Sequence, residues 1–133
     1  MRKASALCWS SSADVRLWQA TANSLTVFAG LAEETYDLRF VQPVVLADNA
    51  GTAIARNGIG CNSTSAYSGR TGYLVCTTNS NGVGGNLYAE FMQVPALGIN
   101  VVTALEHADD AAAQDMTWYG TDALMQLTAE WQG

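Results

Sequence analysis

The chain has 133 residues, which is enough for one hydrophobic core and too few for two. It carries 6 Lys and Arg against 12 Asp and Glu, a net charge of −6, and only 14% of its residues are charged. Nucleic acid is not expected as a partner because six scattered basic residues cannot neutralise a row of phosphates. Hydrophobic residues make up 49% of the chain, which argues against disorder. No apolar run is long enough for a helix that inserts into a membrane.

The low content of charge needs an explanation. Lys occurs once, at Lys3, whereas a monomer of this size ordinarily keeps its surface hydrated with Lys and Glu. An obligate oligomer needs fewer charges because its interfaces resemble a core cut in half. We therefore expect an oligomer. The alternative is a monomer whose surface is covered by Ser, Thr, Asn and Gln.

The N-terminal segment is basic at Met1–Lys3 and then apolar up to Trp9. The apolar stretch is too short for the hydrophobic region of a signal peptide, and serines interrupt it. We expect residues 1–12 to form an N-terminal arm without a secretion signal. The whole chain, residues 1–133, is expected to form one domain.

The first strands follow from alternating apolar residues. Val15–Gln19 is a candidate strand, and Ser24–Gly30 alternates through its Leu, Val and Ala residues. The clearest case is Thr35–Val41, in which Tyr36, Leu38 and Phe40 point one way and the Asp and Arg between them point the other. A period of two is what a half-buried strand requires.

The middle of the chain continues this pattern. Pro43 limits how central the following Val44–Leu46 can be in a sheet, because proline donates no hydrogen bond. The glycine cluster Gly82–Gly85 lacks the Gly-Lys-Ser/Thr of a phosphate loop and predicts a long hairpin turn. Asn62–Gly69 is expected to be a polar loop. Further strands are predicted at Thr52–Ile59, Thr71–Thr77, Leu87–Val94, Val101–Leu105, Thr117–Gly120 and Leu124–Trp131.

Eight or nine short strands with turn signals about every 8–12 residues predict an all-β, antiparallel, jelly-roll-like β-sandwich. One segment argues against a purely β fold. Ala104–Gln114 has high helix propensity, and apolar residues recur there at helical spacing. A short helical turn near residues 108–115 is therefore an alternative for this segment.

The sequence offers little for catalysis. His107 is the one histidine, so a Ser-His-Asp or Cys-His hydrolase would have to use it, yet no Gly-x-Ser-x-Gly is present. The acidic pairs Glu33–Glu34 and Asp109–Asp110 are adjacent residues. On a strand these point to opposite faces, so neither pair forms the facing carboxylates of a glycosidase. We expect no enzymatic activity, no catalytic residue and no cofactor.

Metal binding is not expected either. Cys8, Cys61 and Cys76 have no Cys-x-x-Cys spacing and no histidine cluster to complete a zinc site. Asp48–Asn49 and Asp109–Asp110 are incomplete as calcium loops. We expect three reduced, mostly buried cysteines, as suits a reducing cytosol. The alternative is a Cys61–Cys76 bridge between neighbouring strands.

Aromatic residues are the remaining candidates for ligand binding. Tyr67 and Tyr73 flank a loop rich in Ser, Thr and Asn, and exposed rings beside such groups can stack on sugars. The competing interpretation is that the rings fill a core or an interface, where aromatic residues dominate the energetics. This interpretation also covers the four tryptophans, Trp9, Trp18, Trp118 and Trp131.

Three segments of the chain resemble a known family. They are Arg56–Thr64 (RNGIGCNST), Gly98–Glu106 (GINVVTALE) and Thr117–Gly120 (TWYG). They are similar to the C-terminal β-sandwich domains of phage virion proteins: head fibres, capsid decoration proteins and tail-fibre tips. The resemblance covers roughly residues 35–131. It departs from the family at Ala108–Asp115, where the family has a Ser/Gly-rich turn.

The resemblance implies a trimeric, jelly-roll-like knob on the exterior of a virion, assembled in the host cytoplasm, with the major capsid protein or other virion proteins as partners. It implies no binding residues, because the family's motif is structural. Our leading hypothesis is a capsid decoration protein. The alternative is a receptor-binding or glycan-binding knob that uses Tyr67 and Tyr73 on a host surface glycan.

Overall fold

All the described secondary structure is β-strand. The structure, a computed structural model, describes residues 2–6, 24–30, 35–47, 52–77, 83–109, 115–119 and 124–131. No helix occurs in these ranges, and the all-β prediction is confirmed for them. The strands are β1 (Arg2–Ala6), β2 (Ser24–Ala29), β3 (Tyr36–Ala47), β4 (Thr52–Cys61), β5 (Ser68–Thr77), β6 (Val83–Gln93), β7 (Gly98–Asp109), β8 (Asp115–Trp118) and β9 (Gln126–Trp131).

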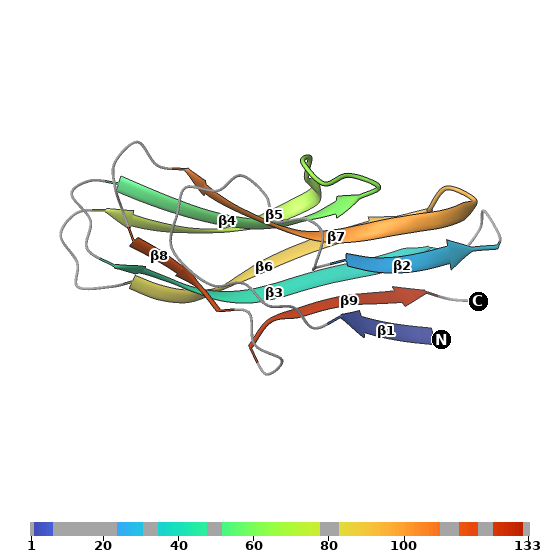
Figure 1. The fold of residues 1–133 in the computed structure, drawn as a ribbon, viewed down its shortest axis with the longest axis horizontal. Coiled ribbons are helices and arrows are strands. Elements are labelled where there is room, and N and C mark those ends of the chain that lie inside the picture. Colours follow the sequence, from blue (N-terminus) through green and yellow to red (C-terminus); the bar gives the residue numbers. More distant parts are fainter. Residues whose placement is uncertain are drawn as a thin grey trace.

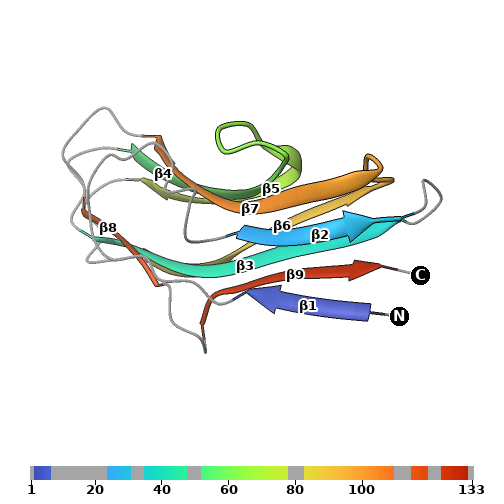
Figure 2. The same cartoon turned by 45° about the vertical axis from the view of Figure 1, so that its right-hand side comes forward.

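The described strands form one antiparallel sheet in the order β1-β9-β3-β6-β5-β4-β7-β2, with β8 added beside β3. The sheet is strongly curled, so that the half containing β4, β5 and β7 lies over the half containing β3, β6 and β9 (Figures 1 and 2). The two halves are continuous through β5 and β6, whose register is set at Arg70 and Glu90. The concave side of the curled sheet contains the core.

The alternation predicted for the third strand builds much of this core. Tyr36, Leu38 and Phe40 are buried, at 0–1% exposure, and the two partners of Phe40, Ala89 on β6 and Leu127 on β9, are buried with it. The intervening Asp37 and Arg39 lie on the convex side, where they pair with each other. Apolar side chains are thereby removed from water while ionised groups stay hydrated, so the alternation of residues 36–40 follows from the sequence pattern.

The expectation that Pro43 would limit the pairing of the next residues is wrong. β3 continues to Ala47, and Val44–Leu46 pairs with β6 on one side and with β8 on the other. On the second side β9 reaches only to Val41, and β8 begins opposite Val44. The carbonyl of Pro43 accepts a hydrogen bond from the Tyr119 N–H, 3.1 Å away. The N–H and C=O of a strand residue point toward the same neighbouring strand. The position where Pro43 lacks an N–H therefore faces the junction between β9 and β8, where the ladder of hydrogen bonds is interrupted.

Two other local predictions are corrected in part. Residues 104–109 belong to β7, so the helical alternative is wrong for them, and Asp115 begins β8; residues 110–114 lie outside the described residues. Val83–Gly85, expected in a hairpin turn, belongs to β6. In both places pairing with a neighbouring strand decides the structure against local propensity.

The other predicted segments have different outcomes. Of the N-terminal arm expected over residues 1–12, Arg2–Ala6 forms β1 and pairs with β9. The candidate strand Val15–Gln19 lies outside the described residues. The strand predicted at Ser24–Gly30 is confirmed as β2. The polar loop predicted over Asn62–Gly69 is confirmed for residues 62–67, whereas Ser68 and Gly69 begin β5.

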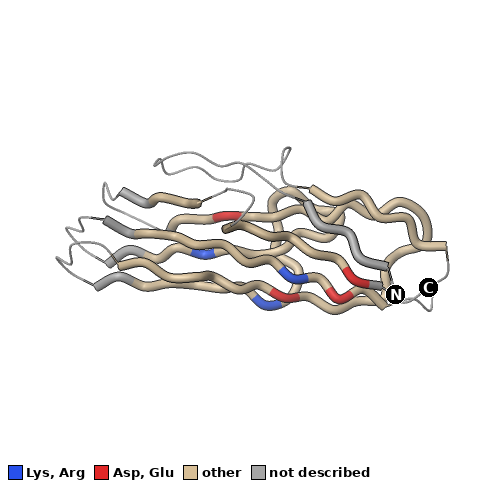
Figure 3. Tube along the Cα trace, turned by 90° about the horizontal axis from the view of Figure 1, so that it is seen from below, with Lys and Arg blue, Asp and Glu red and all other residues tan. Residues whose placement is uncertain are grey.

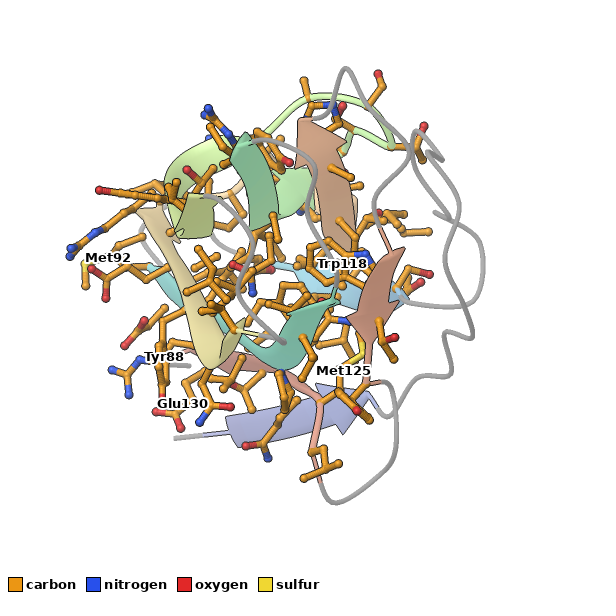
Figure 4. All side chains as sticks on the ribbon, turned by 90° about the vertical axis from the view of Figure 1, so that its left-hand side faces the viewer. Tyr88, Met92, Trp118, Met125 and Glu130 are labelled. Carbon is orange, nitrogen blue, oxygen red and sulfur yellow. The ribbon has the colours of Figure 1, made fainter. Side chains whose placement is uncertain are left out.

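A layer of polar side chains crosses the core between its two apolar clusters. The larger cluster surrounds Leu38 and Phe40, and the smaller one consists of Val44, Ala55 and Leu87 with the half-buried Trp118 packed against it. Figure 4 shows Trp118 on the inner side of the sheet. Between the clusters lie three inward-facing polar residues on three strands, namely Gln42, Asn57 and Glu106.

Candidate interaction surfaces

The loop after β4 folds back over the convex side of β4 and β7. A Cβ at Gly58 would collide with the Tyr67 ring, and a Cβ at Gly60 would collide with the carbonyl oxygen of Ser63. The Tyr67 ring and the loop backbone therefore occupy the space that side chains at these positions would fill. Leu105, which pairs with Gly58 across the sheet, is consequently buried although it points outward. This is why the Arg56–Thr64 segment needs small residues.

Two asparagines anchor the loop to the start of β7. The Asn62 side-chain amide donates to Oδ1 of Asn100 at 2.9 Å, and Oδ1 of Asn62 accepts from the Val101 N–H at 2.8 Å. Asn62 has a φ of 54°, a left-handed conformation that asparagine tolerates better than most residues. Asn100, which is fully buried, in turn donates to the carbonyl of Ala96 at 2.7 Å. The loop is thus held in one conformation by its own polar side chains.

The convex side of β3, β5 and β6 forms a charged face. Arg39 pairs with Asp37 at 2.5 Å, and Arg70 pairs with Glu90 at 3.3 Å. The hydrogen bond from Arg39 to Asp37 raises the pKa of Arg39. Tyr88 stands among these groups, 61% exposed. Figure 4 shows Tyr88 and Met92 projecting from the outer side of β6. A shallow depression of about 200 Å³ is lined by Arg39, Val41, Arg70, Tyr88, Ala89 and Glu90.

A second exposed surface lies on the convex side of β2 and the start of β7. Phe28 and Ile99 are direct partners across the two strands and are 69% and 71% exposed. Leu97, in the turn before β7, is 65% exposed. We refer to the surface formed by these three side chains as the β2–β7 face. The described acidic and basic residues lie on other strands or farther along β7 (Figure 3).

The two tyrosines proposed to bind a ligand, Tyr67 and Tyr73, have different environments in the structure. Tyr67 is half-buried over Gly58 and packs the loop. Tyr73 projects from β5 with 68% exposure, opposite Arg56 of β4. His107 is half-buried on β7, the other neighbour of β4, and is also paired with Arg56. Only Tyr73 of the two tyrosines therefore offers its ring to a ligand.

The β2–β7 face and the depression beside Tyr88 were missed by sequence reasoning. A signal for the first was present, because the alternation of Leu25, Val27 and Ala29 places Phe28 on the opposite side of its strand. No comparable signal existed for the depression, because its residues come from three strands that only the sheet register brings together.

Cys61 is a free thiol, so the alternative Cys61–Cys76 bridge is not formed. Its burial raises the pKa of the thiol, which disfavours the reactive thiolate. Cys8, Asp48–Asn49 and Glu33–Glu34 lie outside the described residues. In the ranges that the structure describes, no three His, Cys, Asp or Glu side chains gather as a metal site would require.

The chain was compared with known proteins. No family model matches it, and neither a curated protein nor a solved structure matches it. In the part of the chain that the structure describes, no helix has the length and apolar character needed to span a membrane.

Proposed function

We propose that this chain is a structural protein of a bacteriophage virion, a capsid decoration protein that assembles as a homotrimer on the outside of the shell. Each subunit is a jelly-roll-like β-sandwich knob, and its partners are the major capsid protein or other virion proteins. The observation that carries the proposal is the exposure of many large apolar side chains on the strands and turns of a sheet with few charges.

These exposed side chains supply the contact area that a decoration protein needs. Isolated apolar residues are normal on a protein surface, but extended groups of them mark interaction sites. Among the residues whose side chains the structure describes, the exposed large apolar and aromatic ones are Phe28, Tyr73, Val75, Tyr88, Met92, Val94, Leu97, Ile99, Tyr119 and Leu124. The chain devotes 14% of its residues to charge, which suits subunits that cover one another and rest on a shell.

Such a protein acts by binding alone. A ligand that binds the assembled shell and not its free subunits stabilises the shell by mass action, by about 2.7 kcal/mol per site at a hundredfold excess over Kd. Shape and apolar complementarity are sufficient for this role. The resemblance of Arg56–Thr64, Gly98–Glu106 and Thr117–Gly120 to phage virion proteins supports the same function.

The experiment that tests the proposal has two parts. Light scattering of the purified protein should give three times the mass of one chain. Sedimentation with shells of the phage that encodes it should carry the protein into the pellet, whereas unassembled capsid subunits should not bind it. A monomer at micromolar concentration that stays in the supernatant with shells present would contradict the proposal.

The second candidate function is a glycan-binding knob on a tail or head fibre. The specific observation in its favour is the exposed Tyr73 ring, together with the Tyr88 ring beside the depression between Arg39 and Arg70. Exposed rings flanked by hydrogen-bonding groups are suited to stacking on a sugar.

A glycan array discriminates between the two functions. Specific hits that disappear in Tyr73→Ala or Tyr88→Ala would favour the glycan-binding knob. Tyr67→Ala is not a clean test of binding, because this ring packs over Gly58 and its removal would alter the loop. An array without hits, together with binding to shells, would favour the decoration protein.

A further inference from the structure

The β2–β7 face is an apolar surface. Phe28 and Ile99 occupy directly opposite positions on neighbouring antiparallel strands, and side chains at such positions point to the same side with Cβ atoms roughly 5 Å apart. Both are about two-thirds exposed, and Leu97 extends the surface beyond the end of β7 with similar exposure. Phe28 and Ile99 therefore expose adjoining apolar side chains to water, with Leu97 two residues before Ile99, at the end of the sheet where the termini lie (Figure 1).

The described side chains of this surface carry no charge. Neither residues 24–30 nor residues 94–105 contain Asp, Glu, Lys, Arg or His. The described charged side chains come from β3, β4, β5, β6, β9 and the later part of β7, and none of them is on β2. They are Asp37, Arg39, Arg56, Arg70, Glu90, Glu106 and Glu130.

β2 stands at one end of the sheet order, and among the described strands it pairs with β7 alone. β1, at the other end of the order, comes near β2 without pairing with it. Proteins usually protect the end strands of a sheet with Lys, Pro or a bulge. The β2 sequence, Ser-Leu-Thr-Val-Phe-Ala, contains neither Lys nor Pro, and its register with β7 is unbroken.

We propose that the β2–β7 face is the surface through which copies of this chain associate. The occupant is a second copy, because the low charge content of the chain, 14% of its residues, suits subunits that cover one another. Each copy has a net charge of −6, so two copies repel least where neither presents charge. On the charged face, contact between two copies would instead dehydrate Asp37, Arg39, Arg70 and Glu90, which is costly unless every group finds a new partner. This inference rests on the homotrimer in the proposed function, but not on the location of that trimer in a virion.

Light scattering and sedimentation of variants test the proposal. Phe28→Glu and Ile99→Glu place a carboxylate in the centre of the face, and both side chains point outward, so the core is untouched. Leu97→Glu, in the turn, is a third variant that leaves both strands unchanged. Each should reduce the mass in solution from three chains to one at micromolar concentration, with the circular dichroism spectrum of the wild type.

The matched control is Tyr73→Glu. Tyr73 is exposed to nearly the same extent as Phe28. It pairs with Arg56, which on its other side pairs with His107 of β7. His107 is eight residues from Ile99, so the two positions are roughly 26 Å apart along β7. This variant should remain a trimer. A wild-type monomer overturns the proposal, as does a trimer that survives both Phe28→Glu and Ile99→Glu or is lost equally in Tyr73→Glu.

Shell binding separates this inference from the proposed function. A trimer that is lost in Phe28→Glu but never binds shells supports the β2–β7 face and contradicts the decoration function. A trimer that binds shells and is unchanged in Phe28→Glu supports the decoration function and overturns the assignment of the face.

Discussion

At the scale of single residues, the polar layer in the core is the least expected feature. Gln42 is fully buried and its amide donates a hydrogen bond to the half-buried Glu106 carboxylate, while the Asn57 amide donates to the Leu87 carbonyl at 3.2 Å. Oε1 of Gln42 and Oδ1 of Asn57 accept no hydrogen bond from the described residues. Buried polar groups are costly without partners, so stability in this layer depends on the contacts that do form.

The first prediction concerns the acceptor of the Gln42 hydrogen bond. Glu106→Ala leaves the buried Gln42 amide without its carboxylate acceptor and should lower the free energy of unfolding by about 1–3 kcal/mol. Glu106→Gln keeps an amide oxygen at the same position and should cost clearly less. Urea denaturation followed by tryptophan fluorescence measures both. Equal losses in the two variants would show that the hydrogen bond to Gln42 is not what the carboxylate contributes.

The second prediction concerns the Cys61 thiol, whose pKa is raised by burial. In a Cys8→Ser/Cys76→Ser background, iodoacetamide should alkylate the native protein more slowly than the unfolded chain at pH values near the unfolded thiol pKa of about 8.5. Because the folded pKa lies above the unfolded one, the native rate should rise at higher pH than the unfolded rate. The associated stability is fully present below the unfolded pKa and is lost as pH rises through the folded pKa. Superimposable pH profiles would contradict this account.

At the scale of elements, the loop between β4 and β5 shows how glycine permits close approach. The loop lies directly over Gly58 and Gly60, and it is also closed by the Ser63 hydroxyl, which accepts from the Ala66 N–H at 2.9 Å. The Ser68 hydroxyl accepts from the Cys61 N–H at 3.1 Å, which ties the end of β4 to the start of β5. Loop and strand therefore form one unit whose conformation depends on the absence of a side chain.

The third prediction tests this unit. Gly60→Ala would place a methyl group against the Ser63 backbone and the Leu105 side chain. It should lower the free energy of unfolding by about 1–3 kcal/mol, as overpacking does. Gly85→Ala is the control, because its Cβ would meet Leu74 only at ordinary contact distance, 3.4 Å. That variant should change stability by less than about 1 kcal/mol. If the two variants are equally stable, the loop does not depend on close approach to Gly60.

At the scale of the whole molecule, charged and uncharged surfaces occupy different strands. The fourth prediction follows from this separation. The Debye length falls from about 10 Å at 0.1 M salt to about 3 Å at 1 M. Association through the β2–β7 face should then be unchanged or stronger at high salt, because salt screens the repulsion between subunits of charge −6. Sedimentation equilibrium at both salt concentrations measures the effect. Weaker association at high salt would indicate that Arg–carboxylate pairs on the charged face hold the subunits together.

Much of the strand content could be predicted from the sequence, because alternation is a local property. The opposite orientations of Leu38 and Arg39 and the location of β2 follow from the order of apolar and polar residues. The behaviour of Pro43 could not be predicted, because it depends on where β9 ends and β8 begins. The hydrogen bond between Gln42 and Glu106 joins residues 64 positions apart, which no local pattern reports.

By itself, the sequence determined the all-β class, the spacing of most strands and the low charge that argues for association between subunits. Only the tertiary structure decided which strands lie at the ends of the sheet, that Phe28 meets Ile99 on a surface without charge, and that Tyr67 packs inward while Tyr73 stays exposed. The physical reason is that alternation specifies two faces for each strand. Which face is covered, and by what, depends on the register between strands that are distant in the chain.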